Sequence, residues 1–311
     1  MGRKGKINVK AKGLKGSLIR YQTTEKLHSK LKQKHEHLQK KEKSIKNSGG
    51  SKNGKKPLKS KFIPFDKDST LLLIGEGDFS YARSIIEEEY IMPENLIVTS
   101  FEKDLEQLVN KYPTTGDDNY KFLLSVGTKV FFNVDATNLI KSLNLSERTP
   151  WAKLLGREWD LKPLNNIMFN FPHGGYKIKD QLRNIMMHQN LVFKYFINCQ
   201  QLLSLVNKSV SAKSNRCMAG YDLERESERR TARNIILALF SGEPYDSWEI
   251  KRLARKAGLR LERSNKFEWE NYPRYHHRRT NGENDTTKPA AERDARIYIF
   301  EEFIEDEESQ S

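Results

Sequence analysis

An apolar run that ends in a glycine-rich turn constrains the fold of this chain more than any other feature. Residues 71–74 read LLLI and residues 75–80 read GEGDFS. A segment that is apolar at every position is typical of a parallel strand buried on both faces. Residues 79–90 are expected to form the next helix, which places Gly75 and Gly77 in a strand-to-helix turn where backbone can approach a ligand. The alternative is a tight turn that needs positive φ.

Strand-like and helix-like segments alternate along the rest of the chain. The first strand is expected at residues 69–74, and two further helices at residues 191–205 and 247–257. This alternation predicts an α/β fold with a doubly wound, mostly parallel sheet of seven strands and right-handed crossovers. The other six strands are expected at residues 96–100, 129–134, 166–171, 234–240, 259–267 and 295–303.

The charge of the chain is distributed very unevenly. The net charge is +14, of which residues 1–60 carry +16 and residues 301–311 carry −6, leaving +4 for residues 61–300. The N-terminal segment has too few large apolar groups to repay the entropy of ordering its backbone. Its charge suits a polyanion, because each neutralised phosphate releases counterions. The predicted parts are a disordered Lys-rich arm (1–63), a folded domain (64–303) and an acidic tail (304–311).

Two segments of the arm point to partners. In residues 24–46, Leu27, Leu31 and Leu38 are spaced by four and seven, which would allow a one-sided basic helix on a partner. A solvated flexible tail is the alternative. Residues 52–56 (KNGKK) are the kind of cluster that nuclear import receptors bind, so a nuclear or nucleolar location is expected.

Cysteine usage and hydropathy exclude several classes of protein. Cys199 and Cys217 have no short-spaced partner and no accompanying His pattern, so we expect no metal site and no disulfide framework. No apolar run approaches the roughly 20 residues that a membrane span needs. Residues 1–15 are too polar for a signal peptide. We therefore expect a soluble protein of a reducing compartment, without membrane partners.

The acidic residues of the glycine turn favour one class of ligand. A dinucleotide fold has a third glycine where Ser80 stands, and a methyl-donor fold usually has glycine where Phe79 stands, so neither pattern is complete. Glu76 and Asp78 would repel a diphosphate and attract the ammonium and sulfonium of S-adenosylmethionine. We therefore expect residues 75–79 to hold that cofactor, in a pocket that Phe79 narrows beside the methionine end. Solvent-exposed turn acids are the alternative.

Acids at the ends of the next two strands extend the predicted cofactor site. Glu102 follows the second strand, where an acid accepts hydrogen bonds from ribose hydroxyls, and Asp104 is the competing candidate. Asp135 ends the third strand, where its carboxylate or the adjoining backbone at Ala136 can contact the adenine edge. The alternative role of Asp135 is a helix N-cap.

The fourth predicted strand ends in a second turn with candidate chemistry, residues 169–175 (FNFPHGG). Asn170 offers an amide to the edge of a base and Phe171 offers a ring for stacking. Pro172 makes the turn rigid, and His173 follows it. The arrangement resembles the Asn-Pro-Pro-aromatic turn of methyltransferases that modify planar nitrogens. The alternative is an ordinary loop with a buried Phe.

Six segments, taken in order, resemble one family: the Rossmann-like methyltransferases that make N3-methyluridine in large-subunit ribosomal RNA. The resemblance implies a Rossmann-like fold that uses S-adenosylmethionine, ribosomal RNA of the pre-60S particle as partner, a nucleolar location and a monomer. A non-catalytic RNA-binding assembly factor on the same fold is the alternative. The segments are LLLIGEGDFSYARSI (71–85), VTSFEKD (98–104), NVDAT (133–137), IMFNFPHGGYKIKDQLRN (167–184), SGEPYDSW (241–248) and NYPRYHHRRTNG (271–282).

The implied reaction needs a site that reads a base and a group that takes a proton. Uridine must lose its N3 proton, and the base must be exposed by flipping or in an unpaired loop. Asn170 is expected to read the base edge, with Phe171 and Tyr245 as stacking candidates. Residues 272–279, which interleave aromatic and basic groups, are expected to contact RNA, or else to form a surface turn. The candidate proton acceptors are Asp78, His173 and His276.

Deleting residues 1–60 should weaken the affinity of the chain for RNA, because this segment carries most of the positive charge. RNA affinity measured across a range of salt concentrations should depend less steeply on salt in the truncated chain than in the full chain. An unchanged salt slope would show that the arm is not the electrostatic contact.

Overall fold

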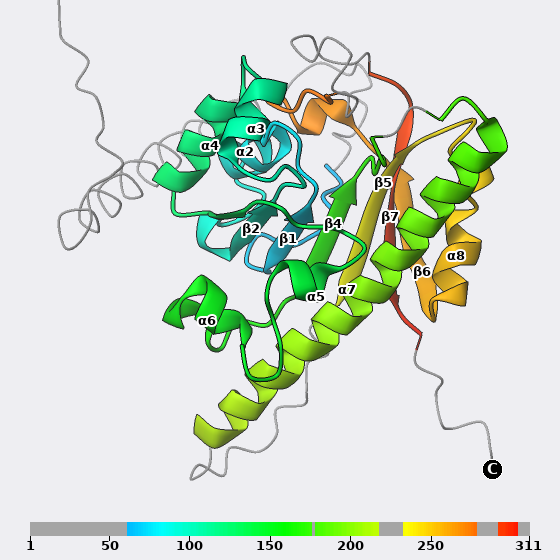
Figure 1. Ribbon diagram of the computed structural model, residues 1–311. Coiled ribbons are helices and arrows are strands. Elements are labelled where there is room, and N and C mark those ends of the chain that lie inside the picture. Colours follow the sequence, from blue (N-terminus) through cyan, green and yellow to red (C-terminus); the bar gives the residue numbers. More distant parts are fainter. Residues whose placement is uncertain (1–60, 176–177, 218–232, 279–291, 304–311) are drawn as a thin grey trace, which may run out of the picture.

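Seven strands form one sheet in a computed structural model of the chain, which describes residues 61–175, 178–217, 233–278 and 292–303 (Figure 1). The strand order is β3-β2-β1-β4-β5-β7-β6. Strands β1 to β5 pair in parallel, and β7 is antiparallel to both of its neighbours. The predicted α/β fold is therefore confirmed. The strands are β1 Leu71–Ile74, β2 Leu96–Thr99, β3 Lys129–Phe131, β4 Asn166–Asn170, β5 Asn234–Phe240, β6 Leu259–Lys266 and β7 Ala295–Glu302.

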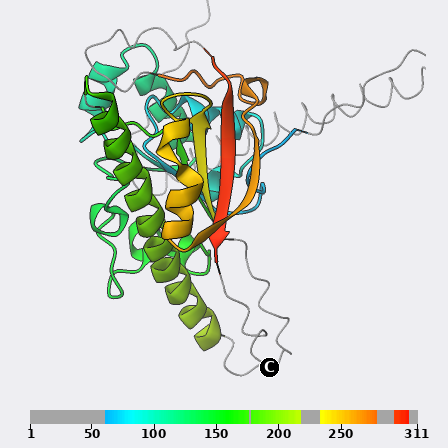
Figure 2. The ribbon, with the colours of Figure 1, turned by 90° about the vertical axis from the view of Figure 1, so that its right-hand side faces the viewer.

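Helices cover both faces of the sheet and divide the core into two halves. Figure 2 shows α7 and α8 on one side of the strands, and α5 and α6 contribute to the same half of the core. α2 and α4 pack against the opposite face, with α3 beside α4. The helices are α2 Ser80–Glu87, α3 Leu105–Lys111, α4 Gly116–Ser125, α5 Leu139–Ser142, α6 Trp151–Leu155, α7 Gln181–Cys217 and α8 Ile250–Lys256.

The first strand shows why this core needs an uninterrupted apolar run. Leu72 and Ile74 point into the half of the core beneath α7, and Leu71 and Leu73 point into the half beneath α2. All four side chains are at most 1% exposed. Since both faces of β1 are covered, a polar residue at any of its positions would lose its water without gaining a partner.

Non-glycine residues with positive φ turn the chain at the carboxyl edge of the sheet. Asn133 (φ 59°) follows β3 and Phe171 (φ 50°) follows β4. β3 therefore ends at Phe131 and β4 at Asn170, earlier than the predicted ends at residues 134 and 171. Such a conformation costs about 1 to 2 kcal/mol for a residue with a side chain, so the surrounding contacts must hold it in place.

Helix α7 exceeds the predicted span of residues 191–205 at both ends. The Asp180 carboxylate accepts a hydrogen bond from the backbone N–H of Arg183 at 2.7 Å, which caps the start of the helix. Further along, the buried Tyr195 hydroxyl lies 3.2 Å from the carbonyl oxygen of Ile167 and 3.0 Å from that of Ile236, and so ties α7 to β4 and β5.

Most of the predicted arm (residues 1–60) and the predicted acidic tail (304–311) lie outside the described residues. Within the described ranges, no helix is long and apolar enough to cross a membrane.

Candidate active site

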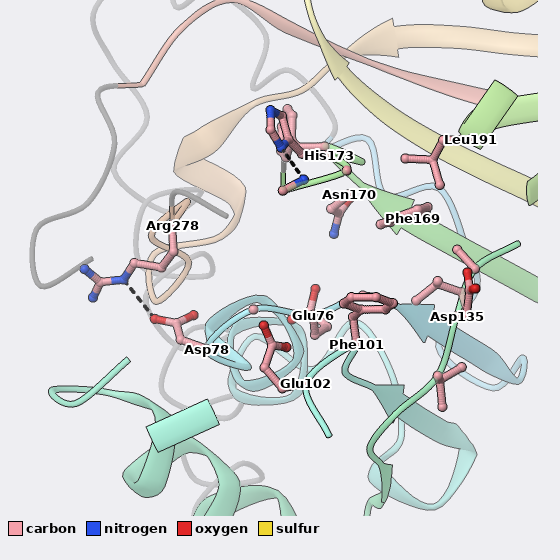
Figure 3. A pocket seen from close by; sticks show the side chains of 18 of the residues that line it. Glu76, Asp78, Phe101, Glu102, Asp135, Phe169, Asn170, His173, Leu191 and Arg278 are labelled. Atoms are coloured by element: carbon pink, nitrogen blue, oxygen red, sulfur yellow. Dashed lines mark hydrogen bonds and ion pairs between the residues drawn. The ribbon is translucent and has the colours of Figure 1, made fainter. Parts of the chain in front are cut away.

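A cavity of about 660 Å³ opens at the carboxyl ends of the parallel strands. Ligands of such sheets bind at this edge, because the loops that leave neighbouring strands separate there. Figure 3 shows Glu76, Glu102, Asp135 and Asn170 around it, and these residues follow or end β1, β2, β3 and β4. The predicted site residues that line the cavity are Gly75, Glu76, Gly77, Asp78, Glu102, Asp135, Ala136, Asn170, Phe171 and His173.

The two glycines of the first turn are each crowded by an aromatic residue. Gly75 has φ +64°, and a Cβ placed on it would lie 2.8 Å from Cε2 of Phe169. A Cβ on Gly77 would lie 3.1 Å from the hydroxyl oxygen of Tyr112. The turn is therefore tight and has positive φ at Gly75, and it also leaves its backbone exposed to the cavity. It fits both a tight turn and a turn that binds a ligand.

Glu76 is a buried acid in the lining of the cavity. Its side chain is 6% exposed, and its carboxylate accepts a hydrogen bond from the backbone N–H of Ala82 at 3.2 Å. Burial, together with the nearby Asp78 carboxylate, raises the pKa of Glu76 to about 8. Glu76 therefore carries a proton at neutral pH until a cation enters the cavity and favours the carboxylate.

Asp78 is also buried, and it joins three segments of the chain. Its Oδ1 accepts from the backbone N–H of Ser80 at 3.1 Å. Its Oδ2 accepts from the Thr115 hydroxyl at 2.7 Å and from Nε of Arg278 at 3.0 Å. Three of the roughly four lone-pair sites of this carboxylate are occupied by donors, so this geometry suits positioning better than the predicted role of Asp78 as proton acceptor.

Phe79 does not line the cavity, and the expectation that it narrows the cofactor pocket is wrong. The residue has φ 61°, which turns its side chain away from the cavity. The ring is fully buried, with centroids 6.3 Å from Tyr120 and 6.1 Å from Phe132. Phe79 thus anchors the start of α2 in the core.

The end of β2 distinguishes between the two candidate ribose-binding acids. Glu102 lines the cavity, and its carboxylate accepts from Nζ of Lys111 at 2.5 Å and from the hydroxyl of Ser100. Asp104 lies outside the cavity lining and caps α3 by accepting from the backbone N–H of Gln107 at 2.9 Å. Its position in the cavity lining therefore favours Glu102 over Asp104 as the candidate ribose-binding acid.

Asp135 is not the N-cap of the next helix, because the N-cap of α5 is Asn138. The residue lines the cavity with its neighbour Ala136. Its Oδ1 also accepts from the backbone N–H and the hydroxyl of Thr137, both at 2.8 Å, which stabilises the turn before α5. The carboxylate is thus partly used by the fold, and the backbone of Ala136 remains beside the cavity.

The side-chain amide of Asn170 is the least satisfied polar group of the site. Both its nitrogen and its oxygen are buried, and neither makes a hydrogen bond of normal length within the part of the chain that the structure describes, although the amide lies close enough to Glu76 to lower the pKa of that carboxyl. The amide points into the cavity (Figure 3). Because an unpaired buried polar group costs about 1 to 3 kcal/mol, this amide points to a ligand with both a donor and an acceptor.

Phe171 and Tyr245 are less available for stacking than expected. The Phe171 ring lines the cavity, but it is 6% exposed and stacks on Phe240 with centroids 4.4 Å apart. Tyr245 does not line the cavity and packs against Phe240 and Trp248. Pro172 is buried and also lies outside the cavity lining, so it acts on the turn.

His173 lies against a second histidine that the sequence did not single out. Its Nδ1 accepts from the backbone N–H of Gly175 at 2.9 Å, and its ring centroid is 4.9 Å from that of His188. Partial burial and the neighbouring His188 lower the pKa of His173. The buried His188 ring is stacked on Trp248 at 4.5 Å, and its Nδ1 lies 2.8 Å from the carbonyl oxygen of Asn184. This stack holds the turn after β4.

The segment 272–278, called the strap here, packs across α2 and forms an exposed turn at Pro273 and Arg274. Its backbone N–H groups at Arg274 and His276 donate to the hydroxyls of Ser84 (3.3 Å) and Ser80 (3.4 Å). Arg278 is buried in its pair with Asp78, so the expectation that its guanidinium contacts RNA is wrong. The strap residues that line the cavity are Tyr275, His276, His277 and Arg278.

Sequence reasoning missed several cavity residues because their partners are distant in the chain. Arg278 and Asp78 are 200 positions apart. Burial and the charge of Arg293 lower the pKa of His277 to about 4, and this histidine was not a candidate. Within the described ranges, no group of His, Cys, Asp or Glu side chains is arranged to hold a metal ion.

The strand order, the glycine turn after β1 and the acid-lined cavity define the class of protein, a Rossmann-like methyltransferase. The chain belongs to the BMT5-like rRNA (uridine-N3-)-methyltransferase family, whose model matches residues 72–279. It is 49% identical to the 25S rRNA (uridine(2634)-N(3))-methyltransferase of Saccharomyces cerevisiae, over 98% of this chain and 94% of the yeast protein. The resemblance inferred from the six sequence segments, and the class of enzyme it implies, are confirmed.

More distant proteins share parts of this chain. A mouse protein, the ferredoxin-fold anticodon-binding domain-containing protein 1 homolog, is 25% identical over 75% of this chain and 31% of its own length. The crystal structure of a 30S ribosomal A1408 methyltransferase from an uncultured bacterium aligns with a TM-score of 0.34 at 11% identity, over 76% of this chain and 89% of that one.

Replacing Arg278 by Ala should lower the free energy of unfolding by about 3 to 5 kcal/mol, because it leaves the Asp78 carboxylate buried without its cation. Urea denaturation measures the change. Arg274→Ala is the matched control, since the exposed pair of Arg274 with Glu87 should contribute no more than about 1 kcal/mol. Equal effects of the two substitutions would contradict the conclusion that the Arg278–Asp78 pair stabilises the fold more than the exposed Arg274–Glu87 pair does.

Proposed function

We propose that this protein transfers a methyl group from S-adenosylmethionine to N3 of a uridine in large-subunit ribosomal RNA. The observation that carries the proposal is the unpaired, buried amide of Asn170 in the cavity. The edge of uracil offers an N–H donor between two carbonyl acceptors, which complements a carboxamide. The reaction named for the yeast relative, methylation of a uridine at N3, supports the same conclusion.

The residues around the cavity fit S-adenosylmethionine. Glu76, which becomes a carboxylate when a cation enters, provides negative charge for its ammonium and sulfonium, beside Asp78, which is paired with Arg278, and Gly77 leaves room for the methionine portion. Glu102 would accept from the ribose hydroxyls, and the backbone at Ala136 would contact the adenine edge. When bound, the cofactor supplies an electrophilic methyl group on sulfur. The protein's task is to place that methyl in line with the target nitrogen.

Among the three candidate proton acceptors, His276 fits the task best. Its ring lines the cavity, and neither ring nitrogen makes a hydrogen bond within the described residues. His173 has its Nδ1 occupied by the Gly175 N–H, so in the neutral ring the proton sits on Nε2. We propose that His276 takes the N3 proton and that His173 donates a hydrogen bond to a uracil carbonyl, where negative charge develops.

The cellular setting is part of the proposal. The basic residues 1–60 suit pre-ribosomal RNA, which favours the pre-60S particle as partner and the nucleolus as location. We also propose a monomer, as the resemblance to the family implies. A non-catalytic assembly factor on the same fold would bind the cofactor and RNA without transferring a methyl group.

The affinity for S-adenosylmethionine should rise as the pH increases from about 6 to about 8. With a pKa of about 8, Glu76 is protonated at the lower pH and becomes a carboxylate, the better partner for an ammonium, as the pH rises. Calorimetric titration across this range measures the trend. Glu76→Gln should remove this contribution, and an equal pH dependence in both proteins would contradict it.

Gly77→Arg should abolish binding of S-adenosylmethionine, because the new side chain would enter the cavity beside Glu76 and Asp78. Circular dichroism should show that the fold survives. Gly77→Ala, which adds only a Cβ 3.1 Å from the Tyr112 hydroxyl, is the control and should have a smaller effect. Mass spectrometry of ribosomal RNA nucleosides should then show that cells carrying Gly77→Arg lose one N3-methyluridine. Unchanged methylation would refute the proposed function.

A further inference from the structure

The basic residues near the cavity fall into two groups, and the first group is already neutralised by the protein. An arginine or lysine that is held by a carboxylate of its own chain gains little from a phosphate, because the exchange releases no additional counterion. The members of this group are Arg274, paired with Glu87, Arg278, paired with Asp78, and Lys111, paired with Glu102.

The basic residues of the second group lie at or near the start of α7, and no carboxylate of the described residues neutralises them. Lys179, Arg183 and Lys194 are exposed, and their side chains make no ion pair within the described ranges. Arg183 and Lys194 are eleven positions apart, which places them on one face of the helix. The same face carries Met187 and Leu191, which line the cavity together with Lys194. The unpaired basic side chains therefore lie on the face of α7 that borders the cavity.

An exposed apolar pair lies beside this basic face. Leu182 is 74% exposed and Met186 is 68% exposed, and their spacing of four places them next to each other on one side of α7. This side faces away from the core, which α7 contacts through Tyr195 and Phe196. In Figure 1 this end of α7 lies at the same upper edge of the sheet to which the arrow of β4 points. Met187 and Leu191 of this end line the cavity. Single exposed apolar residues are ordinary, but an adjacent pair at the entrance to a site marks a contact surface.

We propose that the start of α7 together with the two residues before it, residues 179–194, forms the surface on which the substrate RNA docks. Lys179, Arg183 and Lys194 contact phosphates, and Leu182 and Met186 pack against bases that are unstacked next to the target uridine. The proposal rests on the function proposed above. Apolar side chains of this kind can insert between bases and hold them apart, and RNA bases are accessible to side chains where they are unpaired.

Charge favours RNA over a protein as the occupant of this surface. Residues 179–194 contain three unpaired basic side chains and one acid, Asp180, whose carboxylate is used to cap α7. A protein partner would have to supply matching carboxylates, whereas a nucleic acid offers a phosphate at each nucleotide.

The electrostatic part is tested with the full chain and the double variant Lys179→Glu, Arg183→Glu. The probe is an in vitro transcribed RNA stem–loop with unpaired uridines in the loop, and fluorescence anisotropy measures its affinity across a range of salt. Affinity should fall at least about tenfold, and the salt slope should decrease by about two. The matched control is Lys208→Glu, an exposed residue further along α7, which should behave as the wild type.

The apolar part is tested with Leu182→Ser, Met186→Ser. Affinity for the stem–loop and kcat/KM for its methylation should each fall several-fold, whereas the salt slope and the Kd for S-adenosylmethionine should not change. Leu161→Ser is the control, because Leu161 is also exposed (56%) but does not line the cavity. Wild-type RNA affinity in both double variants would overturn the proposal. Loss of binding to a pre-60S protein, with RNA affinity unchanged, would also overturn it.

The same measurements separate this proposal from the proposed function. If the wild-type chain methylates the RNA and both double variants match it in affinity and rate, only the docking surface is refuted. If the wild-type chain binds the RNA but transfers no methyl group, the proposed function fails, and the affinities of the variants still decide the docking surface.

Discussion

The buried carboxylate of Asp78 is the interaction on which the arrangement of the active site depends. It receives hydrogen bonds from the start of α2, from Thr115 before α4 and from Arg278 of the strap. A charge this deeply buried is tolerated only when its partners are held in place. The glycine turn after β1, α4 and the strap are therefore fixed by one group, and a shift in any of them would disturb the other two.

Much of the sheet could be predicted from the sequence, because parallel strands buried on both faces leave a continuous apolar signature. The glycine turn, Glu102 and Asn170 could be found for a related reason, since residues at the carboxyl ends of such strands meet at one edge. α3 and α4 were not predicted. α4 buries only Gly116, Asn119 and Leu123, which gives no strong apolar pattern, and the short α3 depends on its Asp104 cap.

The sequence was misleading where a local pattern has a partner far along the chain. Arg278 belongs to a basic and aromatic segment typical of RNA contacts, yet its guanidinium is buried against Asp78. Phe79 stands where related turns have glycine. No sequence pattern indicates that its backbone has positive φ and that its ring packs in the core. In contrast, the exposed basic residues at the start of α7 form no sequence motif, and what distinguishes them is that they make no ion pair within the described residues, because the neighbouring Asp180 caps the helix.

The unpaired amide of Asn170 has a consequence for the life of the protein in the cell. A group that costs free energy until a ligand pairs with it makes the free protein the less stable form. Ligands that bind only the native state then increase the folded fraction according to their concentration. Since proteases remove unfolded chains, the amount of this protein should follow the supply of its own ligands. The amide would thus connect the amount of folded enzyme to the availability of the molecules that it binds.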